Sequence, residues 1–180
     1  MIDCESCGTT VVLDGEALRQ AGSRGEMLDL PGMLKLDDMF RTPNGVYIIV
    51  GHIRLNYGPG WWDEFWCVAP DDAGIWLSAD EGDYVFERVL PRRHWPTLTG
   101  KSVVFDGKDY QQTEKDDAIC VGFRGQLPEE ITIGEQHSYT NFISSDGAAL
   151  SRETWIENGQ TQEAWFAGEW LDPWDIELRK

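Results

Sequence analysis

The sequence predicts an all-β fold, in which two similar antiparallel β-meander modules pack together as partly open barrels or as a sandwich. Three observations predict it: apolar and polar residues alternate with the period of two of half-buried strands, turn signals recur at short intervals, and helix signals are scarce. The 180 residues, of which 41% are hydrophobic, suffice to bury a core without disulfides.

The first predicted module consists of four consecutive strands. In residues 46–57 the odd positions are mostly apolar, whereas His52, Arg54 and Asn56 would lie on the other face of a strand. A turn at residues 57–60 then precedes a strand that reaches Val68, and two more strands follow, at residues 75–79 and 84–90. Because Trp76 and Leu77 face opposite sides of one predicted strand, we expect at least one of them to be deeply buried.

The second predicted module repeats this pattern. Its shorter β-like runs occupy residues 102–105, 110–113 and 118–123, with the charged residues 114–117 separating the last two, and Asn158-Gly159 is a strong hairpin signal. We interpret the similarity of the two halves as an internal repeat, in which residues 139–142, 145–147 and 149–153 correspond to residues 62–65, 72–74 and 76–80. The predicted domains are an N-terminal Cys-x-x-Cys knuckle with a linker (1–40), the first β-meander module (41–95) and the second (96–180).

The acidic composition narrows the possible partners. A formal net charge of −17 repels phosphate backbones and anionic lipid surfaces, so we expect neither nucleic-acid binding nor direct membrane insertion, but attraction to a basic protein. A membrane span needs roughly 18 apolar residues, which no run approaches, and the start of the sequence lacks the features of a signal peptide. The expected location is the cytoplasm.

Cys4 and Cys7 form the sharpest chemical motif, because two thiolates at this spacing followed by Gly8 make one zinc knuckle. One pair is half a tetrahedral site. The site could be shared between two chains, be completed by His94 or His137, or be a vestige without metal, so the expected cofactor is none, or zinc at an incomplete or shared site. The other two cysteines are predicted to be small buried hydrophobic residues: Cys67 and Cys120.

The stretch from Trp61 to Trp66 combines aromatic residues with two carboxylates. In a strand, Trp62 and Glu64 share one face and Asp63 lies on the other, so the two carboxylates point apart and are poorly placed for acid and base catalysis on one bond. We therefore predict no catalytic residue and no enzyme. The candidate residues for binding a ligand or a partner are Trp61, Trp62, Glu64, Trp66, Trp76 and Trp95.

Several motifs resemble a bacterial family of uncharacterised domains, the domain of unknown function family numbered 4178. They are GVYIIVGHI (45–53), WDEF (62–65), GIWLS (74–78), RGQLP (124–128) and LSRE (150–153). The resemblance covers most of the chain beyond the first 40 residues. It implies a β-rich cytoplasmic domain, often preceded by a zinc-ribbon-like segment and encoded near phage-shock-type stress proteins and polyamine-related enzymes. It implies no catalytic residue.

Together, the residues and the resemblance predict a non-enzymatic cytoplasmic binding or adaptor module in a bacterial stress-response or membrane-maintenance system. The expected partner is a basic protein, for which a phage-shock-type coiled-coil protein is one candidate. The sequence leaves open whether the chain also forms a homo-oligomer. The alternative is a carbohydrate-binding or hydrolytic protein that uses a tryptophan-rich face with acidic residues.

Overall fold

The computed structural model describes residues 2–3, 9–14, 17–23 and 32–179. Of the first 31 residues it describes only the backbone of three short antiparallel strands, β1 (Ile2–Asp3), β2 (Thr9–Asp14) and β3 (Ala17–Ser23). Cys4 and Cys7 lie outside the described residues. In the part of the chain that is described, no helix has the length and apolar character that a membrane span requires.

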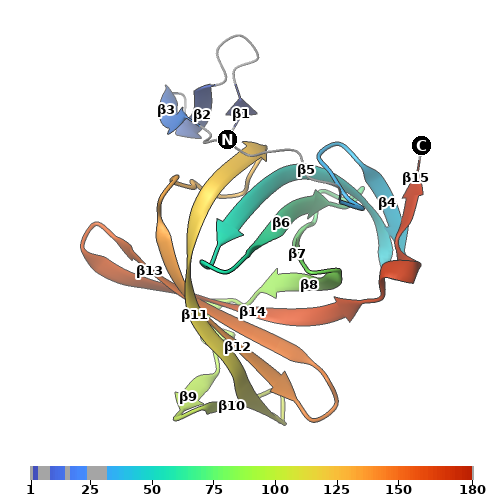
Figure 1. Cartoon of the computed structure of the whole chain (residues 1–180), viewed down its shortest axis with the longest axis vertical. Coiled ribbons are helices and arrows are strands. Elements are labelled where there is room, and N and C mark those ends of the chain that lie inside the picture. The colour runs from blue at the N-terminus through green and yellow to red at the C-terminus, as the bar shows by residue number, and fades with distance from the viewer. Residues whose placement is uncertain (1, 4–8, 15–16, 24–31, 180) are drawn as a thin grey trace.

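Eight antiparallel strands close into a barrel (Figure 1). The predicted all-β class is thus confirmed. The strands in chain order are β5 (Gly45–Asn56), β6 (Trp61–Val68), β7 (Gly74–Asp80), β8 (Asp83–Val89), β11 (Lys108–Gly125), β12 (Gln136–Ser144), β13 (Ala149–Glu157) and β14 (Gln160–Leu171). Around the barrel they follow the order β5-β6-β7-β8-β14-β13-β12-β11, and β11 pairs back with β5.

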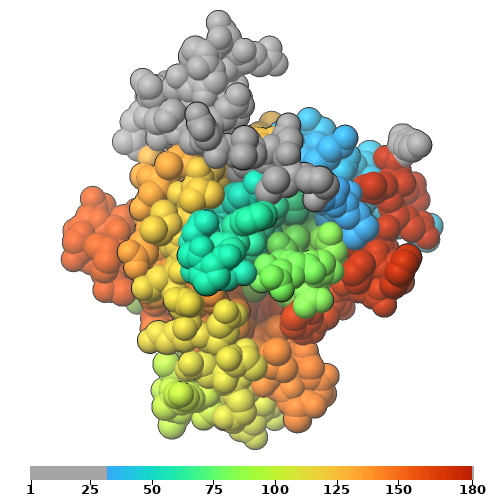
Figure 2. Space-filling model, in the orientation of Figure 1, coloured from blue at the N-terminus to red at the C-terminus, as the bar shows by residue number. Residues whose placement is uncertain are grey.

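Each half of the barrel is one four-stranded meander, β5 to β8 or β11 to β14. The last strands of the two meanders pair with each other, with Phe166 opposite Val89, and so do the first strands, with Cys120 opposite Leu55. The meanders therefore share both edges in one continuous sheet. The hairpin between β13 and β14 projects from the side of the barrel (Figure 2).

Short strands extend the sheet beyond the barrel on both sides. On one side, β4 (Met39–Thr42) pairs with β5, and β15 (Glu177–Arg179) pairs with β4. On the other side, β10 (Ser102–Phe105) pairs with β11, and β9 (Thr97–Thr99) pairs with β10. Two short 3-10 turns, η1 (Arg92–His94) and η2 (Pro173–Asp175), precede β9 and β15. These additions pack apolar side chains against the outside of the barrel wall, as Phe40 and Val103 show.

Both faces of the barrel wall are therefore buried. An inner cluster contains Trp76 and Phe166, and two outer clusters contain Leu77 and Trp165, respectively. Leu77 is 0% exposed and Trp76 is 5% exposed, which confirms the expected burial on opposite faces of β7. The predicted burial of two cysteines is also confirmed: Cys67 and Cys120.

A β-bulge in β5 changes which face its apolar residues occupy. The register against β6 shifts between Ile49 and Gly51, so Ile49 lies in an outer cluster whereas Ile53 and Leu55 lie in the inner one. The expectation of one apolar face along residues 46–57 was therefore wrong, because an extra residue at a bulge inverts the alternation beyond it.

β11 is a single strand of 18 residues, so the expected break at the charged residues 114–117 was also wrong. These residues stay in the sheet because β12 pairs with them, Glu114 opposite Asn141 and Asp117 opposite Ser138, while a bulge between Gln112 and Glu114 absorbs the irregularity. Charged side chains are compatible with a strand whose outer positions face solvent.

The segment between β11 and β12, residues 126–135, packs inside the barrel. Leu127 and Ile131 are buried in the inner cluster, and the backbone N–H of Gln126 donates to the carbonyl oxygen of Val50 at 2.6 Å. This approach requires glycine at position 51, where a Cβ would lie 2.2 Å from the carbonyl oxygen of Gln126. The packed segment leaves a cavity in the part of the barrel that reaches the β7–β8 turn.

Candidate functional site

The barrel encloses a cavity of about 360 Å³, which is in the range of small-molecule sites. Among the described residues that line it, seven are acidic and none is a lysine, an arginine or a histidine. Aromatic side chains form much of the remaining wall, Tyr57, Trp62, Tyr139 and Trp170 among them. The acidic residues are Glu64, Asp80, Glu81, Asp83, Glu87, Glu114 and Glu153.

The first meander supplies one wall of the cavity through strand alternation. Glu64 on β6 lies opposite Ser78 on β7, and Ser78 lies opposite Val85 on β8, two positions before Glu87. Because successive side chains of a strand point to opposite faces, these residues all point into the barrel while Phe65, Leu77 and Phe86 point outward.

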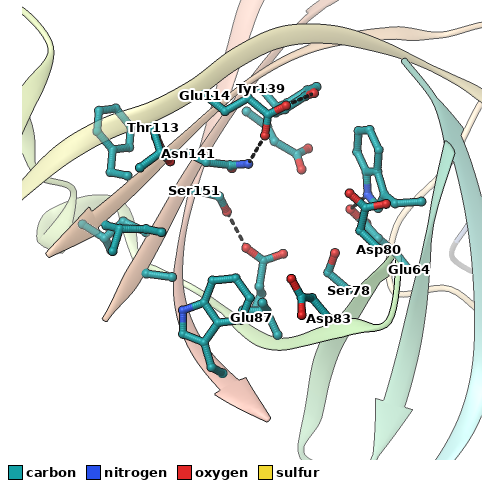
Figure 3. A pocket seen from close by; sticks show the side chains of 18 of the residues that line it. Glu64, Ser78, Asp80, Asp83, Glu87, Thr113, Glu114, Tyr139, Asn141 and Ser151 are labelled. Atoms are coloured by element: carbon teal, nitrogen blue, oxygen red, sulfur yellow. Dashed lines mark hydrogen bonds between the residues drawn. The ribbon is translucent and has the colours of Figure 1, made fainter. Parts of the chain in front are cut away.

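The second meander supplies the facing wall (Figure 3). Ser151 on β13 lies opposite Asn141 on β12, which in turn lies opposite Glu114 on β11. Glu153 lies opposite Tyr139. The side chains that correspond in the proposed repeat therefore meet around one cavity, since Ser78 and Ser151 both line it, and Trp62 and Tyr139 are in edge contact with ring centroids 5.1 Å apart.

Neutral donors hold three of the carboxylates. The Oγ of Ser151 donates to Oε1 of Glu87 at 2.6 Å, and Nε1 of Trp62 donates to Oε1 of Glu64 at 2.8 Å. Glu114 accepts hydrogen bonds from the Oη of Tyr139 at 3.1 Å and from the Nδ2 of Asn141 at 3.2 Å. Each of these hydrogen bonds orients its carboxylate without neutralising it.

The electrostatics of the cavity favour protonated acids. Burial raises the pKa of Glu87 to about 7 against an ordinary 4.5, and the negative charge of Glu153 adds to this effect. Burial also raises the pKa of Glu64 well above its usual range, together with the negative charges of Glu153 and Glu87. The pKa of Asp80 at the rim is raised by burial and by the neighbouring Glu81 and Glu114.

A second chamber of about 30 Å³ lies behind the main cavity and shares Glu64, Glu87 and Glu153 with it. It also contains Glu129 of the packed segment and His137, whose Nδ1 lies 3.3 Å from Oε2 of Glu153. Burial alone would lower the pKa of His137, but Glu153 and Glu135 outweigh it and raise that pKa. His137 therefore partly compensates the negative charge of the glutamates that the two cavities share, from the side of the small chamber.

The structure separates the six predicted binding residues into two groups. Trp62 and Glu64 line the cavity, Trp76 lines the smaller chamber, and Trp66 packs on Trp76 with ring centroids 5.0 Å apart. The other two lie outside the barrel: Trp61 is 48% exposed beneath Arg54, and Trp95 donates from Nε1 to the carbonyl oxygen of Leu90 at 2.9 Å.

Asp63 and Glu64 point apart, as predicted. Asp63 lies on the outside of β6, where Nε of Arg54 donates to its Oδ1 at 2.7 Å and Nε2 of His52 lies 2.9 Å from the same oxygen. Burial alone would raise the pKa of Asp63, yet the hydrogen bonds from His52 and Arg54 outweigh it and lower that pKa. Asp63 is thus a paired structural carboxylate, whereas Glu64 faces the cavity.

Sequence reasoning missed most of the cavity, in particular Glu87, Glu153, Ser151 and Asn141. Strand parity places Glu87 and Glu153 on the same strand faces as Val85 and Ser151, respectively, but it does not indicate which face points into the barrel. The zinc hypothesis for Cys4 and Cys7 falls outside the described residues. Within the described ones, no group of three or more His, Cys, Asp and Glu side chains is arranged to hold a metal ion.

Fold and site together define a closed eight-stranded antiparallel β-barrel with an acidic internal cavity. The sequence model of a family described as Domain of unknown function (DUF4178) matches residues 35–173. The chain therefore belongs to this family, and the match spans all eight barrel strands. No curated protein and no solved structure matches the chain.

Proposed function

We propose that this protein is a non-enzymatic binding module whose barrel cavity holds a small organic cation. The observation that carries the proposal is the charge of the lining: in the part of the chain that the structure describes, seven acidic residues and no basic residue surround about 360 Å³. Removing carboxylates from water is costly unless a positive charge compensates them. A bound cation would supply that charge.

The wall chemistry favours an organic cation. The aromatic rings of Trp62 and Tyr139 line the cavity, and aromatic rings attract ammonium groups through their quadrupoles. The acids belong to both facing walls and, in the described part of the chain, form no group suited to a single metal ion. An ammonium group with several N–H donors can reach separate carboxylates.

Ligand screening by tryptophan fluorescence and thermal shift tests the proposal. We expect alkylammonium compounds to quench or shift the emission of Trp62 and to raise the melting temperature, whereas neutral sugars and dicarboxylates do neither. Glu87→Gln should weaken this response, while Glu157→Gln, which removes an equal charge from an exposed position on β13, should not. A response to sugars alone would instead support the carbohydrate-binding alternative, and a response to calcium or magnesium alone would overturn the organic cation.

A second candidate function, an adaptor role toward a basic protein, is supported by one exposed side chain. Trp174 of η2 is 92% exposed on a chain with a net charge of −17. Exposed tryptophans are common anchors of protein interfaces, and the acidic surface would speed the encounter with a basic partner. The proposed partner is a phage-shock-type coiled-coil protein in a bacterial stress response.

A further inference from the structure

The carboxylates of the cavity fall into two tiers. The inner tier, Glu64, Glu87 and Glu153, lines both the main cavity and the small chamber behind it, and its side chains are half-buried. The outer tier, Asp80, Glu81, Asp83 and Glu114, lines only the main cavity, and its side chains are exposed. The inner tier thus lies at the inner end of the cavity, and the outer tier lies at its mouth.

β8 gives the distance between the tiers. Asp83 and Glu87 are four residues apart and point into the same cavity, and a strand rises about 3.3 Å per residue, so their Cα atoms are about 13 Å apart. Val85 lies between them on the same face, and Trp170 lies directly opposite Val85 on β14. The space between the tiers is therefore bordered by apolar and aromatic surface.

The inner tier has unused acceptor capacity. Within the described residues, Glu64 and Glu87 each accept one hydrogen bond, both through Oε1 and both from a neutral side chain. Both half-buried side chains face the main cavity, whose described lining holds no basic side chain, while His137 lies with them in the small chamber behind it. A primary ammonium has three N–H donors, so it can donate to more than one of the inner carboxylates.

We propose that the ligand is a linear alkyl dication, with one primary ammonium group at the inner tier, the second at the outer tier, and its methylene chain along Val85 and Trp170. The inference rests on the proposed function and specifies its ligand class. A single cation would leave one tier uncompensated, whereas two linked ammonium groups place charge against both.

Isothermal titration calorimetry with a series of α,ω-diaminoalkanes of increasing length, and with the monoaminoalkanes of equal length, tests the inference. We expect each diamine near the optimal length to bind at least tenfold more tightly than its monoamine, and the affinity to pass through a maximum with length. Asp83→Asn and Glu114→Gln should weaken diamine binding severalfold and monoamine binding much less. Glu87→Gln should weaken both, and Glu157→Gln neither.

The outcomes separate this inference from the proposed function. Equal binding of monoamines and diamines would overturn the dication while the cation cavity stands. Absence of binding by every amine would overturn both. Circular dichroism of each variant establishes that it is folded, and the paired outer-tier variants allow the test to proceed if one of them fails to fold.

Discussion

Asp63 and Glu64 are adjacent carboxylates with opposite roles in stability. Asp63 pairs with Arg54, which is 8% exposed, whereas Glu64 faces other carboxylates across the cavity. The difference arises from the alternation of β6, because one residue of register separates an outer carboxylate paired with Arg54 and His52 from an inner one that faces other carboxylates.

Replacement by a neutral isostere should therefore change the free energy of unfolding in opposite directions at the two positions. Asp63→Asn removes the charge that pairs with buried Arg54 and should cost about 1.5–3 kcal/mol. Glu64→Gln removes repulsion with Glu87 and Glu153 and should raise the free energy of unfolding of the unliganded protein at pH 8. Urea unfolding of both variants measures these effects, and destabilisation by Glu64→Gln would contradict the assigned environment.

Glu87 should make the unliganded barrel less stable at high pH. Its folded pKa of about 7 lies above the ordinary value of 4.5, so its contribution to stability is fully present below pH 4.5 and is lost as the pH rises through 7. The loss would be on the order of 3 kcal/mol. The groups that face Glu87 are Glu64 from β6, and Glu153 and Ser151 from β13.

Melting temperatures between pH 5 and pH 8 check this dependence. The wild type should lose stability over this range, and Glu87→Gln, which imitates the protonated acid, should lose much less. Equal slopes for the two proteins would show that Glu87 keeps an ordinary pKa in the fold.

Alternation could not identify the cavity from sequence, because both faces of the barrel wall are buried. A half-buried strand shows one polar face, but β7 has Leu77 in an outer cluster and Trp76 in the inner one. The inward glutamates then resemble ordinary exposed charges. The orientation of Asp63 and Glu64 relative to each other could be predicted, since it depends only on the period of two, but which of them faces inward could not.

At the scale of elements, most strands and turns of the two meanders were predictable because their signals are local. Asn158 and Gly159 adopt positive φ angles of 50° and 73°, as the predicted hairpin requires. The two seams, β8 with β14 and β5 with β11, join residues that are far apart in sequence, so no local pattern indicated that the meanders close one barrel. The bulge in β5 was likewise invisible in the composition of residues 46–57.

The packed segment, residues 126–135, should depend on glycine at position 51. Gly51→Ala would place a Cβ 2.2 Å from the carbonyl oxygen of Gln126, so the backbone must shift and the free energy of unfolding should fall by more than 2 kcal/mol. Gly107→Ala is the control, since its added Cβ meets nothing within 4 Å and only the φ of 74° opposes it. Equal costs in urea unfolding would contradict the close approach.

At the scale of the whole molecule, the charge of −17 acts on two kinds of ligand in different ways. Exposed charges are screened beyond a Debye length of about 8 Å at physiological ionic strength, whereas charges inside the barrel are screened less. Salt should therefore separate encounter at the surface from binding in the cavity.

The association rate of a basic coiled-coil peptide should fall steeply as salt rises toward roughly 1 M, while its dissociation rate changes less. Trp174→Ala should raise the dissociation rate and leave the association rate nearly unchanged. Surface plasmon resonance at several salt concentrations measures both rates. A flat salt dependence would indicate that the acidic surface serves solubility alone.

The central claim is that a cation binds among the buried carboxylates inside the barrel, and the number of protons released on binding tests it most directly. Calorimetric titration of a diaminoalkane at pH 7, in buffers with different ionisation enthalpies, gives this number. With a pKa of about 7, Glu87 is half protonated when the cavity is empty, and a bound cation favours its ionised form. We predict release of up to about half a proton from Glu87 per bound cation, and less release in Glu87→Gln. Carboxylates with ordinary pKa values are already ionised at pH 7, so binding without proton release would place the cation on the outer surface and contradict the account.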